Sequence, residues 1–136
     1  MENITKEQAD IIGEVANICT GTAATALSMI INRSTNITTP LVEVLDNENT
    51  LESDNHILVK VQYTSGLDGT NLMVLDVQDA LVIASLMMGG DGRNLSNLQL
   101  DDLTLSAIAE AMNQMCGSIA TSMASLLSRP TDIGFP

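Results

Sequence analysis

The sequence predicts a single α+β domain, and three observations lead to that fold class. Two long segments, residues 5–33 and 101–128, have the apolar periodicity of amphipathic helices. Shorter β-rich runs and a third helical pattern lie between them. Residues 10–40 also return 96 positions later as residues 106–136, with ten identities where chance would give roughly two. The chain therefore contains an internal duplication.

The first helix is expected over residues 5–33. Thr5 and Gln8 have the spacing of a capping box, in which the Thr hydroxyl caps a free backbone N–H and Gln reaches back. One stripe of this helix is apolar or small at 3.6-residue spacing: Ile12, Val15, Cys19, Ala23, Ala26 and Ile30. Such a stripe is typical of a helix packed against other elements.

Three β-rich runs follow, at Leu41–Leu45, His56–Tyr63 and Asn71–Asp76. The turn-forming residues 65–69 between the last two runs favour an antiparallel pair. Asp76 is placed to cap a helix that reaches about Met88 and ends at a Gly-Gly pair.

Residues 94–100 have the composition of a linker to the second long helix. Asp101 or Asp102 opens that helix, and Pro130 prevents it from continuing beyond about Ser128. The order helix, strands, helix, helix completes the α+β pattern.

The duplication divides the domain, residues 1–136, into unequal parts. Residues 5–96 form a first half, and residues 97–136 form only the start of a second. Because three strands are expected after Pro40, three more are expected after Pro136. The chain is thus expected to be a fragment of a longer domain, with an exposed sheet edge or apolar helix face.

Composition argues against several functions. The chain has 5 Lys and Arg against 17 Asp and Glu, a net charge of −12, and Tyr63 and Phe135 are its only aromatic residues. Nucleic-acid binding needs a basic surface and usually stacking aromatics. No signal peptide is recognisable, and the longest apolar runs are too short for a transmembrane segment. Cys19 and Cys116 stand apart, which is typical of reduced structural cysteines.

The common catalytic sets are not recognisable either. His56 is the single histidine, so no Ser-His-Asp or Cys-His set and no His/Cys metal cluster can be assembled. The glycine-rich residues 88–93 follow a helix instead of a strand and lack the Lys-Ser/Thr of a phosphate loop. A turn is expected there.

A second stripe on each long helix combines polar and small residues. Residues three and four apart share a helix face, so Glu14 stands with Asn17, and Glu110 with Asn113. The full stripes are Asp10, Glu14, Asn17, Gly21, Ala24 and Ser28, and then Ser106, Glu110, Asn113, Gly117, Ala120 and Ala124. A glycine inside a helix costs about 1 kcal/mol relative to alanine, so the two glycines require a reason.

Either stripe, taken alone, is explained without a functional site: its polar residues are solvated, and its glycine allows close helix packing. The duplication of the whole set in register instead favours a site that enters another protein's active centre, because little side-chain bulk blocks the approach.

The pattern (Asp/Ser)-x3-Glu-x2-Asn-x22-Pro resembles the signature of the CheC/CheX/FliY family of response-regulator phosphatases. It is satisfied twice, by Asp10, Glu14, Asn17 and Pro40, and by Ser106, Glu110, Asn113 and Pro136. The second copy most resembles the catalytic middle domain of the family's flagellar motor switch phosphatases. The resemblance implies a CheC-like pseudo-two-fold fold, with two long site-bearing helices packed on an antiparallel sheet.

The resemblance also implies the substrate, phospho-CheY, and a location at the cytoplasmic face of the flagellar basal body among the switch proteins. Mg²⁺ would be supplied by CheY, and this chain would hold no metal or cofactor. Asn17 and Asn113 would orient the attacking water, and Glu14 and Glu110 would contact a lysine of the regulator. The supporting residues would be Asp10, Ser106, Gly21, Gly117, Pro40 and Pro136, with both prolines starting strands.

Two alternatives stay open: a non-catalytic CheY-binding scaffold of the switch complex, and a free-standing chemotaxis phosphatase of the CheC type.

Overall fold

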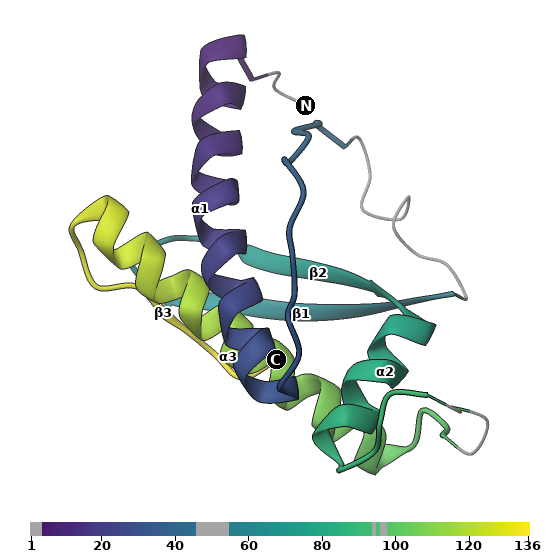
Figure 1. Cartoon of the computed structure of the whole chain (residues 1–136). Coiled ribbons are helices and arrows are strands. Elements are labelled where there is room, and N and C mark those ends of the chain that lie inside the picture. Colours follow the sequence, from purple (N-terminus) through teal and green to yellow (C-terminus); the bar gives the residue numbers. More distant parts are fainter. Residues whose placement is uncertain (1–3, 46–54, 94, 96–97) are drawn as a thin grey trace.

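The fold consists of three helices packed on a three-stranded sheet within residues 4–45, 55–93, 95 and 98–136, which the computed structural model describes (Figure 1). The elements are α1 (Lys6–Ile31), β1 (His56–Ser65), β2 (Thr70–Asp76), α2 (Val77–Met87), α3 (Asp102–Leu127) and β3 (Asp132–Ile133). The predicted α+β class is confirmed. Three positions of the expected linker, 94, 96 and 97, lie outside the described residues.

The two long helices are structural copies of each other. Both have 26 residues, and α3 begins and ends 96 positions after α1. Each is followed by a residue in the left-handed conformation, Asn32 and Ser128, both with φ of 54°. This conformation ends a helix by turning the chain away from its axis. The duplication in the sequence is therefore preserved in the backbone.

The helix starts use different side chains for the same purpose. Thr5 forms the predicted capping box, because its hydroxyl accepts from the Gln8 backbone N–H at 3.0 Å and its own N–H donates to Gln8 Oε1 at 2.9 Å. At α3, Asp101 Oδ1 accepts from the Thr104 N–H at 2.9 Å. That hydrogen bond lowers the pKa of Asp101, as expected for a carboxylate that caps a helix.

The sheet has the strand order β2-β1-β3, and both pairings are antiparallel. The predicted hairpin is confirmed, with β1 paired to β2 from His56↔Asp76 to Gln62↔Thr70. The connecting turn contains Gly66 with φ of +86°, and a Cβ there would collide with the Pro130 carbonyl. Glycine thus allows the turn to lie directly against the chain that enters β3.

The predicted strand at Leu41–Leu45 is wrong. Residues 36–45 form no sheet pairing within the described part of the chain, and they run alongside α1 instead (Figure 1). A β-rich composition gives a strand only where a neighbouring strand supplies hydrogen-bond partners. The expectation that Pro40 starts a strand is wrong for the same reason, since residues 40–45 are not in a strand. The same expectation for Pro136, the last residue of the sequence, stays a prediction.

The prediction for Asp76 is correct in position and wrong in mechanism. Asp76 is the N-cap of α2, but its side chain makes no capping hydrogen bond. Its Oδ1 lies 3.1 Å from His56 Nε2 instead, because the register places these two residues opposite each other. The Asp76 carboxylate, which the sequence predicts as the cap of α2, therefore pairs with His56 on the neighbouring strand instead.

The main core lies between α2, α3, the sheet and the C-terminal end of α1. Its buried members are Ile31, Ala80, Ile83, Ala84, Ile108, Ala111 and Met112, and Ile57, Val59, Met73 and Leu75 of the sheet pack against them. The apolar stripe of α1 is divided: Cys19 and Ala23 are buried, whereas Ile12 is 46% exposed. The N-terminal half of α1 thus contributes little to this core.

By length and composition alone, α1 is apolar enough to cross a membrane. Only 17% of the relevant window is buried, and a single such helix near the N-terminus is weak evidence. The sequence-based expectation of no transmembrane segment stays a prediction.

Equivalent positions of the two helices provide a matched test of this burial difference. Ile108 is 1% exposed and Ile12, its counterpart, is 46% exposed. We expect Ile108→Ala to lower the free energy of unfolding by about 2–5 kcal/mol and Ile12→Ala by about 1 kcal/mol or less. Urea denaturation followed by circular dichroism measures both. Equal losses of unfolding free energy in the two variants would contradict a core that contains Ile108 and leaves Ile12 outside.

Candidate active site

The four pattern residues of the first copy lie around one hollow. Asp10, Glu14 and Asn17 on α1 face Pro40 across a space of about 500 Å³, whose other lining residues include Gly13 and Leu41. Glu14 and Asn17 are exposed on the helix surface. The structure thus brings together residues that are 30 positions apart in the sequence.

Two glycines of α1 lie next to the segment that carries Pro40. A Cβ on Gly13 would stand 3.4 Å from Val42 Cγ2, and one on Gly21 would stand 3.9 Å from Ile37 Cδ1. Gly21, predicted as a supporting residue, is therefore in contact with the segment that carries Pro40. Gly13 was missed by the sequence analysis, although an interior helix glycine is itself a signal of close packing.

Hydrogen bonds fix the start of the same segment. The Thr35 hydroxyl donates to the Ala24 carbonyl at 2.6 Å, and the Thr35 N–H donates to Ser28 Oγ at 3.0 Å. These contacts hold the chain against the last turns of α1 before it runs back toward Pro40. Ser28, named in the sequence only as part of the stripe, is thus a support for one wall of the hollow.

The second copy is arranged differently. Glu110 is exposed, Asn113 is half-buried, and Gln114 Nε2 donates to Glu110 Oε1 at 3.0 Å. Pro136 lines a separate hollow of about 330 Å³, together with Leu105, Ala109 and Lys60. The structure therefore does not bring Pro136 into one hollow with Glu110 and Asn113.

Two further residues of the second copy, predicted as supporting residues, lie on the surface of α3 or next to open space. Ser106 is exposed on α3, and a Cβ on Gly117 would meet no other atom within 4 Å among the described residues. Nothing in the structure explains this glycine.

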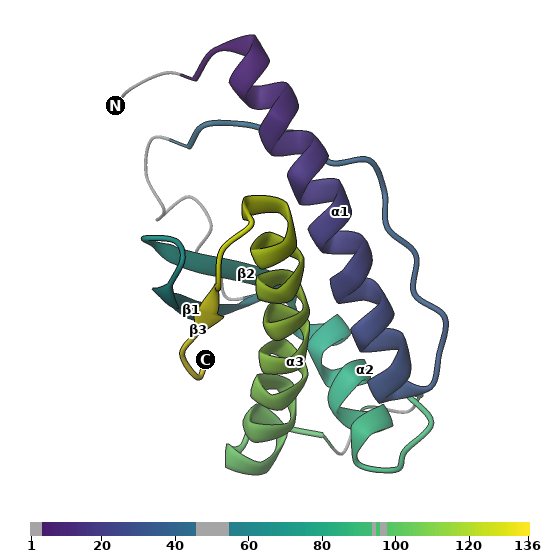
Figure 2. The same cartoon turned by 90° about the vertical axis from the view of Figure 1, so that its left-hand side faces the viewer.

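The two Glu/Asn pairs are far apart along the helix pair. Each pair lies in the N-terminal half of its helix, and α1 and α3 run in opposite directions (Figure 2). The pairs consequently lie toward opposite ends of the pair of helices. This geometry gives two separate surfaces, each with its own carboxylate and amide.

The chemistry that these surfaces offer is limited to binding and positioning. An amide can orient a water molecule, and an exposed carboxylate can bind a cationic group. No group of three or more His, Cys, Asp or Glu side chains that could hold a metal occurs among the described residues. Burial raises the pKa of both free thiols, Cys19 and Cys116, so neither is an activated nucleophile.

Comparison with known proteins agrees with the duplicated pattern. The model of the CheC-like family matches residues 7–44 and 103–134, which contain both Glu/Asn pairs. The chain is 41% identical to the flagellar motor switch phosphatase FliY of Bacillus subtilis, over 100% of this chain and 36% of that protein. It is 26% identical to the CheY-P phosphatase CheC of the same organism, over 90% of this chain and 61% of that protein.

A solved structure shows the same fold. The crystal structure of FliY from Thermotoga maritima superposes with a TM-score of 0.88 at 47% identity, and the match covers 99% of this chain and 69% of that chain. The CheY-P phosphatase CheX of T. maritima is 34% identical over 70 residues, which are 52% of this chain and 43% of that protein. The chain thus spans between about a third and three-fifths of the length of these curated relatives. On the family match and the shared fold, the chain belongs to the CheC-like family.

Proposed function

We propose that this chain hydrolyses the aspartyl phosphate of phospho-CheY at two separate sites. The observation that carries this proposal is that α1 and α3 each carry a Glu/Asn set, with Glu14, Asn17 and Glu110 exposed and Asn113 half-buried. The family's named members include FliY, CheC and CheX phosphatases. Small residues follow each set along its stripe. In the first copy the small residues contact residues 35–37 of the same chain, so a second protein would approach at Glu14 and Asn17 themselves, which are exposed.

Hydrolysis at such a site needs positioning more than proton abstraction. A water molecule attacks phosphorus, the bond from phosphorus to the aspartyl oxygen breaks, and inorganic phosphate leaves while the carboxylate is regenerated. Asn17 or Asn113 orients that water through its side-chain amide, as the water-orienting glutamine does in GTPases. An amide is no strong base, but holding the water in line removes much of the entropic barrier.

The carboxylates fix the register of the complex. Glu14 or Glu110 binds the lysine beside the phosphorylated aspartate through a charge-assisted hydrogen bond. On docking, water is excluded from this contact, which strengthens it relative to an exposed ion pair. In this proposal Mg²⁺ belongs to CheY.

The cellular setting follows from the relatives in the same way. We place this chain at the cytoplasmic face of the flagellar basal body, among the switch proteins, because the relative with 41% identity is named for the flagellar motor switch. The alternative is that the chain is a free-standing chemotaxis phosphatase of the CheC type, which is not bound to the flagellar motor.

The two sites are expected to act independently. Asn17→Ala and Asn113→Ala should each remove turnover at their own site, by on the order of 10², and the double variant should fall to the self-hydrolysis rate of CheY. Phosphate release from CheY charged with acetyl phosphate measures all four proteins. Circular dichroism serves as the control for folding, since polar-to-alanine changes on an exposed helix face cost about 0.5 kcal/mol or less.

A folded single variant as inactive as the double variant would show one shared centre and contradict the two-site proposal. Binding of phospho-CheY by the wild-type chain without faster phosphate release would instead identify a scaffold.

We expect that CheY, and not this chain, binds the Mg²⁺ that hydrolysis requires. The first stripe offers two carboxylates and one amide, and the second offers one carboxylate and one amide. Neither set has enough protein oxygen ligands to enclose Mg²⁺ by itself. We expect titration calorimetry to detect no tight Mg²⁺ binding to the isolated chain, while phosphate release from phospho-CheY still requires Mg²⁺. A tight site on the isolated chain would overturn this assignment.

Gln114 is expected to strengthen the binding of phospho-CheY at the second site. Its amide holds Glu110, whereas the equivalent position in the first copy is Ile18. In an Asn17→Ala background, Gln114→Ala should raise KM for phospho-CheY severalfold and leave kcat nearly unchanged, because only the orientation of a binding group is lost. The matched control is Ile18→Ala in the Asn113→Ala background. An equal rise of KM in that control would argue against a role for the hydrogen bond.

A further inference from the structure

The helix face that leads to the first Glu/Asn pair is acidic. Residues three or four positions apart share a helix face, so the face of Glu14 continues toward the helix start through Asp10 and Glu7. All three carboxylates are exposed, and within the described residues none of them takes part in an ion pair. At the rise of an α-helix, Asp10 lies about 6 Å and Glu7 about 10 Å before Glu14. We call Glu7 and Asp10 the acidic approach to the first site.

The equivalent approach to the second site carries no charge. The residues 96 positions after Glu7 and Asp10 are Leu103 and Ser106. Both are exposed, and Leu103 is 69% exposed. Because these positions are exposed in both copies, packing within the described part of the chain does not account for the difference between them. The contrast therefore points to what each helix face meets outside the chain.

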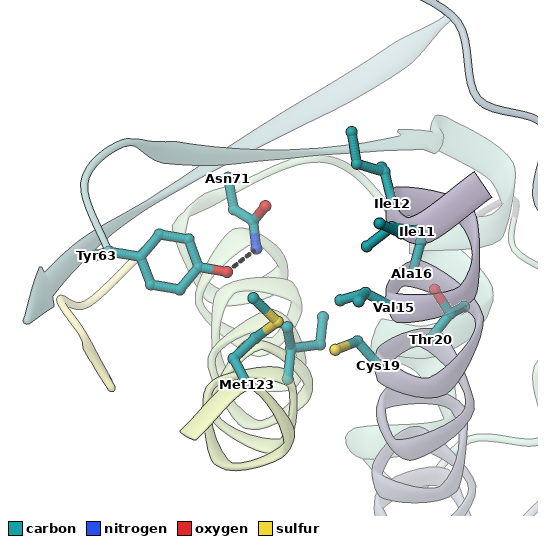
Figure 3. A pocket seen from close by; sticks show the side chains of 10 residues that line it. Ile11, Ile12, Val15, Ala16, Cys19, Thr20, Tyr63, Asn71 and Met123 are labelled. Atoms are coloured by element: carbon teal, nitrogen blue, oxygen red, sulfur yellow. Dashed lines mark hydrogen bonds between the residues drawn. The ribbon is translucent and has the colours of Figure 1, made fainter. Parts of the chain in front are cut away.

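The acidic approach lies on the outer side of α1. Figure 3 shows Ile12 and Val15 directed into an apolar hollow of about 450 Å³ on the other side of the helix. Asp10 and Glu14 instead line the hollow that contains Asn17. A partner that brings a phosphoryl group to Asn17 consequently meets both carboxylates at once.

We propose that the two sites bind phospho-CheY through different forces. At the first site, Glu7 and Asp10 form ion pairs with basic groups of the partner, and at the second site Leu103 makes an apolar contact. This inference rests on the proposed function and adds to it the residues that determine how each site recognises the partner.

One kind of partner side chain suits both approaches. Because α1 and α3 are structural copies, a partner docked in the same way on each helix presents the same side chain to Glu7 and to Leu103. A lysine or arginine pairs with a carboxylate through its charged head and covers a leucine with its aliphatic stem. The docking edge of the partner therefore carries basic residues.

Salt separates the two modes of binding. Ions screen exposed charge pairs, and charges at the edge of an interface act mainly on the association rate and its salt dependence. Burial of apolar surface does not depend on charge. The first site should thus lose affinity for phospho-CheY with rising salt more steeply than the second site.

Single-site proteins measure this difference. Asn113→Ala leaves the first site and Asn17→Ala leaves the second. Raising the ionic strength from about 0.01 M to about 0.15 M shortens the screening length from about 30 Å to about 8 Å. This change should raise KM for phospho-CheY about fivefold more in the first-site protein than in the second-site protein, with little effect on kcat.

Exchange of the two approaches tests the residues themselves. In the first-site protein, Glu7→Leu with Asp10→Ser should reduce the salt dependence of KM to that of the second-site protein. In the second-site protein, Leu103→Glu with Ser106→Asp should raise it to that of the first. The variant Glu7→Gln with Asp10→Asn removes only the charges and should act as the first exchange does. Circular dichroism checks that each variant is folded.

A matched control removes the same charge elsewhere. Asp68 and Asp79 are exposed and lie on neither long helix. Asp68→Asn with Asp79→Asn in the first-site protein should leave the salt dependence of KM unchanged. If this control lost as much salt dependence as Glu7→Gln with Asp10→Asn, net charge would be the cause and the proposal would be overturned. Equal salt dependence in the two single-site proteins would also overturn it.

Direct binding separates this inference from the proposed hydrolysis. CheY carrying beryllium fluoride in place of the phosphoryl group can be titrated with the charge-only variant and with its control, and fluorescence anisotropy gives Kd. Loss of salt-dependent binding in the variant alone, without phosphate release by the wild-type chain, would support the inference and contradict the hydrolysis. Phosphate release with no such loss would contradict only the inference, and absence of binding would contradict both.

Discussion

The packing of α1 against α3 is the contact on which the rest of the structure depends. Small buried residues, Cys19 and Ala23 on α1 and Ala120 on α3, let the two helices approach closely. The Ser122 hydroxyl donates to Thr22 Oγ1 at 3.0 Å between them. Because the helices run in opposite directions, this one contact places the N-terminal halves that carry the Glu/Asn pairs toward opposite ends of the helix pair. α3 is covered in addition by α2 and the sheet.

Periodicity and turn chemistry predicted the elements whose formation depends on nearby residues. The capping box at Thr5, the hairpin around residues 65–69 and the N-cap at Asp101 each involve partners a few positions away. The errors at Leu41–Leu45 and Asp76 have another origin. Whether a segment becomes a strand, and whether a carboxylate pairs with a histidine, depends on the element that lies next to it in the fold. For residues 41–45 the opposite element is α1 and not a strand.

The candidate site shows the same limit. The spacing of Glu14, Asn17 and Pro40 was visible in the sequence, and the structure gathers these residues around one hollow. In the second copy, which has the identical spacing, Pro136 lines a hollow with Leu105 and Ala109 and without Glu110 or Asn113. A linear pattern fixes which residues share a helix face, but the path of the chain after the helix decides whether the proline returns to that face. In the first copy, the hydrogen bonds of Thr35 to Ser28 and Ala24 fix the start of this path.

Glu14, Asn17 and Glu110 are exposed, and Asn113 is only half-buried. In the proposed reaction, these side chains therefore cannot accelerate hydrolysis without the partner. An exposed carboxylate in water gains little from an ion pair, and an exposed amide exchanges its bound water freely. Neither group is held in the water-excluded setting that makes fixed dipoles effective. The helix surface therefore serves as half of a site, and the partner has to supply the other half together with the exclusion of water. Small residues along the stripe fit this role, because each bulky side chain would keep the amide further from the phosphorus atom.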